Sequence, residues 1–235
     1  PTGPDANSQH TRGDDDVMPL YQDRGGVVWV GTRAGGASHW SPKSWTLGHY
    51  RSSLFANTAV NAFADDGAGT VWVGTADGLV EIDTVQRTER RYTRESTGPL
   101  RLADDIVMAL LHDRNGALWI GTMSGGLARF DAKRRSLRSY RSIPDDPTTL
   151  PVDGVMCVYE ARDGNVWVGT YGGGLARIDR ETGNLTRYPH HGEDGRLPHG
   201  RCPRAASPRP HMAGDQFRQA ATCDERSAGC AKRDL

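Results

Sequence analysis

The sequence predicts an all-β fold that is built from four copies of one structural unit. The strings VVWVGT, TVWVGT, ALWIGT and NVWVGT place tryptophans 43, 47 and 48 residues apart, and a tyrosine follows each tryptophan after 20 or 21 residues. Two marks in constant phase define a repeat of about 45 residues, which lies in the range of repeat architectures. Within each string the side chains alternate with a period of two, which favours strands over helices. The marks are Trp29, Trp72, Trp119 and Trp167, and Tyr50, Tyr92, Tyr140 and Tyr188.

Each unit is predicted to contain four strands. The first is an apolar run bounded by turn residues, as expected of a buried inner strand, and the second is the tryptophan string. The third begins after a glycine-containing turn, and the fourth ends at the tyrosine. The first strands are expected within 17–23, 60–66, 104–113 and 152–161, the third within 78–83, 126–131 and 174–179, and the fourth within 44–50, 88–93, 136–141 and 184–189.

Glycines mark the turns between these strands. In the sequences DRNG and ARDG, the glycine three residues before the tryptophan ends a hairpin turn. A non-glycine residue with positive φ would cost roughly 1–2 kcal/mol at this place. The glycine six residues after the tryptophan marks the next turn. The glycines of the first kind are Gly26, Gly69, Gly116 and Gly164, and those of the second kind are Gly35, Gly78, Gly125 and Gly173.

A single four-stranded meander of this size cannot bury both of its faces, and stacking on its neighbours is the usual remedy. The radial form of such stacking is a β-propeller. We therefore predict a partial β-propeller of four four-stranded antiparallel blades over residues 1–188, with the tryptophans filling the space between adjacent blades. The expected blades are 14–50, 57–93, 104–141 and 152–188, and the structural repeat includes Gly31, Gly74, Gly121 and Gly169.

Composition narrows the range of partners. The chain has 29 basic and 29 acidic side chains, so no basic face indicates nucleic acid as a partner. The sequence contains no run of 18 apolar residues, so it predicts no membrane-spanning helix, and no segment resembles a signal peptide. The cysteines form no Cys-x-x-Cys pair, and His190, His191, His199 and Cys202 match no standard metal site, so we expect neither a metal nor a cofactor.

The periodicity stops after Tyr188. Residues 189–235 are rich in Arg, Pro, Ala, Gly and Ser and contain scarcely any branched apolar side chains. Such a composition buries too little apolar surface to offset roughly 1–2 kcal/mol of backbone entropy per residue. We expect a disordered tail, or one whose reading frame has been altered.

The pattern from Asp105 to Tyr140, D-x-V-x-x-L-x-x-D-x-x-G-x-L-W-I-G-T-x-x-G-G-L-x-R-x-D and then a tyrosine, resembles the two-component regulator propeller repeat. All four units share its phase marks. Repeats of this family build the ligand-sensing ectodomains of bacterial hybrid sensor histidine kinases and of some membrane-bound diguanylate cyclases. Family members typically carry many more repeats, followed by an immunoglobulin-like domain, a transmembrane helix and an output domain. The resemblance thus implies that this chain is a fragment.

By this resemblance the chain is expected in the periplasm, where it would bind a small molecule such as a saccharide. Its other partner would be the rest of the parent receptor, and the membrane would be reached only through segments outside this chain. The sequence contains no kinase, receiver or GGDEF motif, so we expect no catalytic residues and no enzyme activity.

Ligands of propellers usually meet the loops at one end of the central channel. By resemblance, these loops are the links into the inner strands and the turns TRAGG, TADG, TMSGG and TYGGG. The glycine frame of these turns is constant while the other residues vary. A guanidinium suits carboxylates and an aromatic ring suits sugar faces. The predicted ligand contacts are Arg33, Asp77, Met123, Ser124 and Tyr171.

Two alternatives remain open at this stage. Many propellers are protein-binding scaffolds. The streptogramin-type lyases are propellers with comparable tryptophan-bearing repeats, although no histidine with a nearby acid recurs at a turn in this sequence as a general base would.

Overall fold

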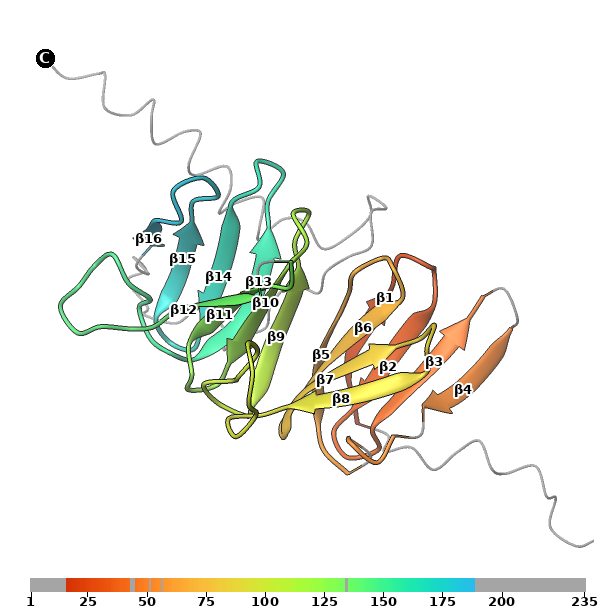
Figure 1. Cartoon of the computed structure of the whole chain (residues 1–235). Helices are drawn as coiled ribbons and strands as arrows, with labels where there is room; N and C mark the ends of the chain where they lie inside the picture. The colour runs from red at the N-terminus through yellow and green to blue at the C-terminus, as the bar shows by residue number, and fades with distance from the viewer. Residues whose placement is uncertain (1–15, 43–44, 51, 56, 134, 189–235) are drawn as a thin grey trace, which may run out of the picture. The chain divides into compact units, whose positions relative to one another are not determined.

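The computed structural model describes residues 16–188, except for positions 43–44, 51, 56 and 134. These residues form 16 strands and no helix, arranged as four separate four-stranded antiparallel sheets (Figure 1). Every sheet is a meander in chain order, from β1–β4 in blade 1 to β13–β16 in blade 4. The predicted all-β partial propeller of four blades is thereby confirmed. The tail predicted for 189–235 lies outside the described residues.

The strands follow the repeat. Blade 1 contains β1 (Val17–Gln22), β2 (Val28–Thr32), β3 (Ala37–Ser41) and β4 (Thr46–Tyr50). Blade 2 contains β5 (Val60–Asp65), β6 (Thr70–Thr75), β7 (Gly78–Asp83) and β8 (Thr88–Tyr92). Blade 3 contains β9 (Val107–His112), β10 (Ala117–Thr122), β11 (Leu127–Asp131) and β12 (Ser136–Tyr140). Blade 4 contains β13 (Val155–Glu160), β14 (Val166–Thr170), β15 (Gly174–Ile178) and β16 (Leu185–Tyr188).

The constant spacing from tryptophan to tyrosine has a geometric cause. In blade 3, Trp119 of the second strand pairs with Arg129 of the third strand, which in turn pairs with Arg138 of the fourth strand. Tyr140 lies two residues beyond Arg138 and therefore on the same face as Trp119, because strand side chains alternate. The ring centroids of Trp119 and Tyr140 lie 5.8 Å apart, and the distances in the other blades are 5.8, 6.0 and 5.1 Å.

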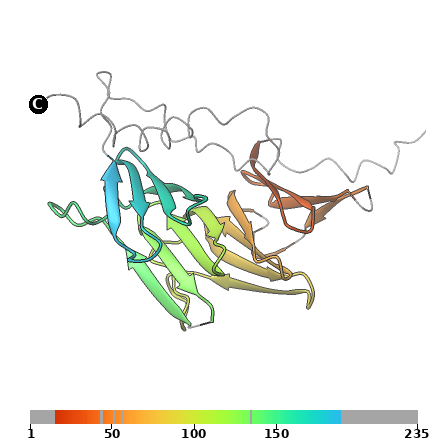
Figure 2. The same ribbon diagram turned by 90° about the horizontal axis from the view of Figure 1, so that it is seen from above.

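Successive blades pack face to face through this aromatic pair. Figure 2 shows the four sheets following one another in the order of the sequence. Each inner strand contacts the inner strand of the next blade, as β5 contacts β9 and β9 contacts β13. The core between blades 3 and 4 joins Trp119 of blade 3 to an aliphatic layer of blade 4. Trp29, Trp72 and Trp119 are only 3%, 7% and 4% exposed, so their indoles are interior packing groups.

The glycine of the tryptophan string makes room for the next blade. A Cβ added at Gly31 would lie 2.7 Å from Val60 Cγ1, and one added at Gly74 would lie 2.7 Å from Val107 Cγ1. At Gly121 the corresponding distance to Val155 Cγ1 is 2.5 Å. Real Cβ atoms do not approach so closely, so only glycine lets the first valine of the following inner strand reach the sheet.

The inner strands share an irregularity where they begin. The pairing register shifts after Val17, Val60, Val107 and Val155, where one residue is added opposite the second strand. Such β-bulges bend a strand and redirect a side chain, and they are common near functional sites. Here the bulge lies at the end of the sheet that holds the candidate site.

The glycine predicted to end the first turn has positive φ in all four blades, with values of 87, 114, 84 and 86°. In the second turn the left-handed residue is Gly78 in blade 2, as the sequence places it. In the other blades, whose turns are one residue longer, the following glycine is left-handed, at Gly36, Gly126 and Gly174, and in blade 4 Gly172 is left-handed as well. No helix among the described residues is long and apolar enough to cross a membrane.

Candidate functional site

The turns between the second and third strands meet the links into the inner strands at one end of the blades, which we call the loop end. The same backbone hydrogen bond makes this contact in every blade: the residue after the conserved threonine donates its N–H to the last link residue. The donors and acceptors are Arg33 to Asp16 (3.1 Å), Ala76 to Ala59 (3.0 Å), Met123 to Ile106 (3.0 Å) and Tyr171 to Gly154 (2.7 Å). Turn and link therefore form one surface, as the resemblance implied.

The threonine of each tryptophan string fixes the turn that follows it. Thr122 Oγ1 donates to the carbonyl of Gly126 at 3.0 Å and accepts from the N–H of Gly125 at 3.0 Å. Thr32 makes both bonds in blade 1. The Thr122 side chain is buried, so the hydroxyl satisfies backbone groups that would otherwise lack partners. The conserved threonine is accordingly a support of the loop end.

Met123 and Tyr171 are brought together across Gly154. A Cβ at Gly154 would lie 3.1 Å from the carbonyl oxygen of Met123 and 3.1 Å from Cβ of Tyr171. Both side chains remain accessible, with Met123 39% and Tyr171 60% exposed. Blades 3 and 4 therefore each present an accessible side chain at the loop end, a thioether on one and an aromatic ring on the other, from turns whose backbones meet at Gly154.

The other predicted contacts lie in different surroundings. Arg33 Nε donates to Asp16 Oδ2 at 2.7 Å, so its guanidinium is paired with the link of its own blade. The carbonyl of Asp77 accepts from Arg91 Nε at 2.8 Å, which ties Asp77 to the outer strand β8.

Ser124 forms hydrogen bonds to another residue of the loop end. Its N–H and Oγ both donate to Asp104 Oδ2, at 2.7 and 2.9 Å. Asp104 is buried, and these bonds stabilise its carboxylate there. Of the five predicted residues, Met123 and Tyr171 belong to turns of neighbouring blades that both border Gly154, and Ser124 follows Met123 in the first of these turns.

Three link residues at this end were not among the predicted ligand contacts: Asp104, Asp153 and Gly154. Asp153 accepts the N–H of Ser142 at 2.6 Å and pairs with Arg141 at 2.8 Å, while its carbonyl accepts from Gly126. These bonds hold the link against both the outer strand and the preceding turn. All three residues lie within three residues before the first valine of an inner strand. Aligning the repeats on these valines could have identified them from the sequence.

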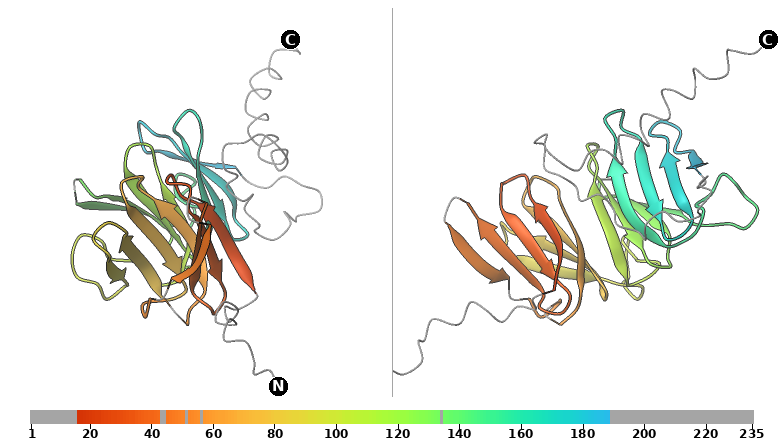
Figure 3. Two further views of the ribbon diagram at one scale, coloured as in Figure 1. Left: turned by 90° about the vertical axis from the view of Figure 1, so that its right-hand side faces the viewer. Right: turned by 180° about the vertical axis from the view of Figure 1, so that it is seen from behind.

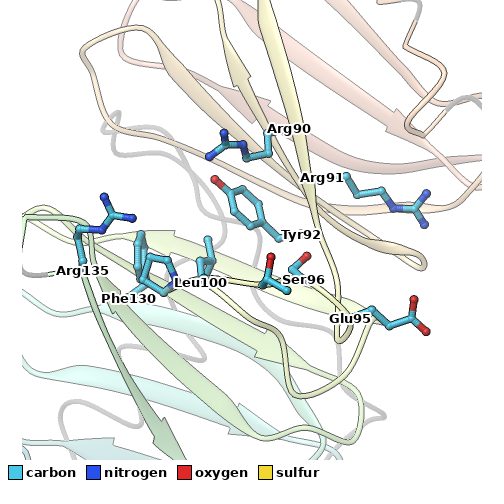
Figure 4. A pocket seen from close by; sticks show the side chains of 11 residues that line it. Arg90, Arg91, Tyr92, Glu95, Ser96, Leu100, Phe130 and Arg135 are labelled. Atoms are coloured by element: carbon cyan, nitrogen blue, oxygen red, sulfur yellow. The ribbon is translucent and has the colours of Figure 1, made fainter.

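A hollow lies between the outer strand β8 and blade 3, and residues 95–100 of the link from β8 to β9 form part of its lining. Its volume is about 540 Å³, and Leu100 and Phe130 provide its apolar part. Figure 4 shows Arg90 and Tyr92 on one side and Arg135 on the other. Tyr92 Oη donates to Glu81 at 2.7 Å, and burial raises the pKa of Tyr92.

Groups at contacts between blades have shifted pKa values. Tyr21 Oη of blade 1 donates to Asp65 Oδ2 of blade 2 at 2.9 Å, and burial together with this carboxylate raises the tyrosine pKa. Burial lowers the pKa of His112, with Arg24 adding to the effect. The described residues contain no cluster of three His, Cys, Asp or Glu side chains that could hold a metal ion.

Two of the four repeats match a known protein family. A family model described as "Two component regulator propeller" matches residues 101–124 and 149–172, which lie in blades 3 and 4. No protein of curated function matches the sequence at a significant level.

Solved structures share the fold at low sequence identity. The extracellular domain described as that of a hybrid two-component system of B. thetaiotaomicron superposes with a TM-score of 0.61 at 21% identity, over 73% of this chain and 23% of that one. Virginiamycin B lyase from Staphylococcus aureus superposes with a TM-score of 0.58 at 19% identity, over 78% of this chain and 58% of the lyase. PorZ of Porphyromonas gingivalis gives 0.55 at 15% identity, over 79% and 29% of the two chains.

This chain therefore spans about a quarter of the first of these proteins and less than two thirds of the lyase. At such identities the likeness shows the fold. The family itself is indicated by the matched repeats, in agreement with the resemblance seen in the sequence. Two repeats of the chain, at residues 101–124 and 149–172, match the two-component regulator propeller model.

Proposed function

We propose that this chain is a ligand-sensing propeller segment of a bacterial receptor that acts outside the cytoplasm, and that its own part is binding without catalysis. The receptor's output would be that of a histidine kinase or a diguanylate cyclase. The repeat family and the likeness to an extracellular domain of a two-component system support this role. A ligand can shift such a receptor only through different affinities for two of its states.

The observation that carries the proposal is that Met123 and Tyr171 are both exposed and lie on turns of neighbouring blades that meet at Gly154. An exposed aromatic ring suits the apolar face of a sugar, and its hydroxyl can form hydrogen bonds at the rim. A thioether adapts to irregular apolar surfaces. The ligand class that fits best is a small saccharide, held across blades 3 and 4 at the loop end.

Calorimetric titration of the full chain with a panel of neutral and acidic oligosaccharides tests this proposal. We expect Tyr171→Ala to weaken binding of the selected saccharide roughly two- to twelvefold, as loss of a ring contact of about 0.5–1.5 kcal/mol implies. The matched control is Trp45→Ala, because Trp45 is 81% exposed in the outer hairpin of blade 1. Absence of saccharide binding, or equal weakening by both changes, would contradict the proposed site.

An enzyme is the second candidate, favoured by the likeness to virginiamycin B lyase. A variant of that lyase with a histidine replaced by alanine is described as catalytically inactive. The described turns and links of the loop end contain no histidine here, which supports binding over lyase chemistry. Opening of a streptogramin B ring by the purified chain would favour the enzyme.

A protein-binding scaffold is the third candidate. Two results together would favour it. The chain would bind a protein from a membrane-protein extract with an affinity that Tyr171→Ala does not change, and it would bind none of the saccharides.

A further inference from the structure

The hollow of about 540 Å³ at the junction of blades 2 and 3 is lined by arginines from both blades. These two blades follow each other in the series of sheets (Figure 3). Arg90 of β8 lines the hollow from blade 2, and Arg135, in the turn between β11 and β12, lines it from blade 3. Figure 4 shows the two guanidinium groups on either side of the hollow. A volume of this size suits a small organic molecule.

The junction of blades 3 and 4 holds the same two backbone positions in a closed form. Arg138 of β12 corresponds to Arg90, because each lies two residues before the tyrosine of its blade. Gly183 corresponds to Arg135, because each lies five residues before that tyrosine and has positive φ, 70 and 51°. Arg138 Nη2 donates to the carbonyl of Gly183 at 3.3 Å, and a Cβ added at Gly183 would collide with the Arg138 guanidinium. The arginine of the outer strand therefore spans this junction because the turn opposite it has no side chain.

Arg135 changes this arrangement between blades 2 and 3. It places a second guanidinium at the turn position where Gly183 leaves room for an arginine. Arg90 interacts instead with Tyr92 and Glu81 of its own blade. Within the described part of the chain, the Arg135 side chain forms no hydrogen bond or ion pair. Two like charges that line one hollow repel each other, and a bound anion relieves this repulsion.

The rest of the lining indicates which kind of anion fits. Leu100 and Phe130 contribute apolar surface beside Arg135 (Figure 4). Glu95 also lines the hollow, but Figure 4 shows it near Arg91, on the side away from Arg135. The hollow therefore combines guanidinium groups, which suit carboxylates, with apolar surface that suits a flat ring.

We propose that this hollow binds an aromatic carboxylate, with its ring against Leu100 and Phe130 and its anionic groups paired with Arg90 and Arg135. A guanidinium fork matches the two oxygens of a carboxylate. A ring with a carboxylate at each end can engage both guanidinium groups, so terephthalate is a suitable probe. None of the residues that line the hollow is among the five predicted ligand contacts of the turns, so this inference does not depend on the proposed saccharide.

Titration of the full chain with terephthalate at low ionic strength, followed by NMR of the backbone amides, tests the proposal. We expect saturable shifts at Leu100 and Arg135 and none at Met123 or Tyr171. Arg135→Gly should weaken binding about five- to twelvefold, between the upper value for an exposed ion pair and the lower value for a hydrogen bond to a charged group.

The change to glycine suits the positive φ of position 135, so the variant keeps its turn. Arg87→Gly is the matched control. Arg87 holds the same turn position in blade 2, with a φ of 56°, and does not line the hollow. Its replacement should leave the affinity for terephthalate unchanged.

Two further ligands test the chemical class. The corresponding neutral diol, in which hydroxymethyl groups replace both carboxylates, keeps the ring without the charge, and sulfate keeps the charge without the ring. Each should bind more weakly than terephthalate. Absence of terephthalate binding, equal weakening by Arg135→Gly and Arg87→Gly, or equal affinity for the diol would overturn the proposal. Equal affinity for sulfate would show that the apolar surface contributes nothing and would overturn the aromatic class.

Discussion

At the scale of single residues, the tryptophans of the repeat act as packing groups whose contribution depends on what covers them. Trp119 is 4% exposed and donates from Nε1 to Asp113 Oδ2 at 2.8 Å. Its ring packs against Tyr140 and lies 5.6 Å from the guanidinium carbon of Arg129. Trp167 packs on Tyr188 in the same way but has no described blade beyond it.

We expect Trp119→Ala to lower the free energy of unfolding by about 3–5 kcal/mol, the usual loss for a buried aromatic side chain. Trp167→Ala should cost less than half as much, because part of its ring stays hydrated in the folded chain. Urea denaturation of dilute protein measures both values. Equal losses would show that the two indoles have the same surroundings.

His112 gives the stability a dependence on pH. Its side chain is half-buried, Nδ1 is buried and makes no hydrogen bond within the described residues, and burial lowers its pKa. The unfolded chain takes up a proton near pH 6.5, whereas the folded chain resists protonation. Its contribution to stability is therefore complete above that pH and is lost as the pH falls through the window below it.

We expect the free energy of unfolding of the wild type to fall more steeply than that of His112→Gln from about pH 7 to about pH 5. Chemical denaturation at several pH values measures both slopes. The carboxylates are common to the two proteins, so the difference isolates the histidine. Parallel curves would contradict the assigned pKa shift.

At the scale of elements, blades are joined by hairpin clamps as well as by apolar faces. Arg114 in the turn between β9 and β10 donates to the carbonyls of Ala161 and Arg162 at 2.8 and 3.0 Å. It also lies 3.7 Å from Glu160, whose side chain is 8% exposed. Removing Arg114 leaves this carboxylate with less compensation for its burial.

We expect Arg114→Ala to destabilise the chain by about 1–2 kcal/mol, with faster amide exchange in β13 and β14. Arg162→Ala is the matched control, because it removes the same side chain at the same position of a blade that has no described neighbour to clamp. In dilute protein the control should leave the stability unchanged. Equal effects of the two substitutions would contradict the clamp between blades.

At the scale of the whole molecule, periodicity made most of the fold predictable. The four tryptophans predicted the number of blades. The constant spacing from tryptophan to tyrosine predicted the four-stranded meander in each blade, because this spacing places the two rings on the same face of the sheet. The added residue in the turns that end at Gly36, Gly126 and Gly174 shifts the left-handed position by one, which a glycine pair such as Gly125–Gly126 leaves undecided in the sequence.

The candidate site was less predictable, because it depends on contacts between repeats. Variation among turn residues selected Met123, Ser124 and Tyr171 as candidates, and their chemistry favoured Arg33 and Tyr171. Only the structure separates Ser124, whose hydroxyl donates to Asp104, from Met123 and Tyr171, whose side chains are exposed. Hydrogen bonds across 20 residues leave no periodic signal in one sequence.

The account depends on the tryptophan strings forming the junctions between successive blades, and oxidation of tryptophan by hydroxyl radicals measures this most directly. In dilute protein, mass spectrometry should find Trp45 oxidised fastest, Trp167 at an intermediate rate, and Trp29, Trp72 and Trp119 slowest. This order follows from 81% exposure of Trp45, half-burial of Trp167 and exposure of 7% or less for the other three. Equal oxidation of the four repeat tryptophans would contradict the stacked blades.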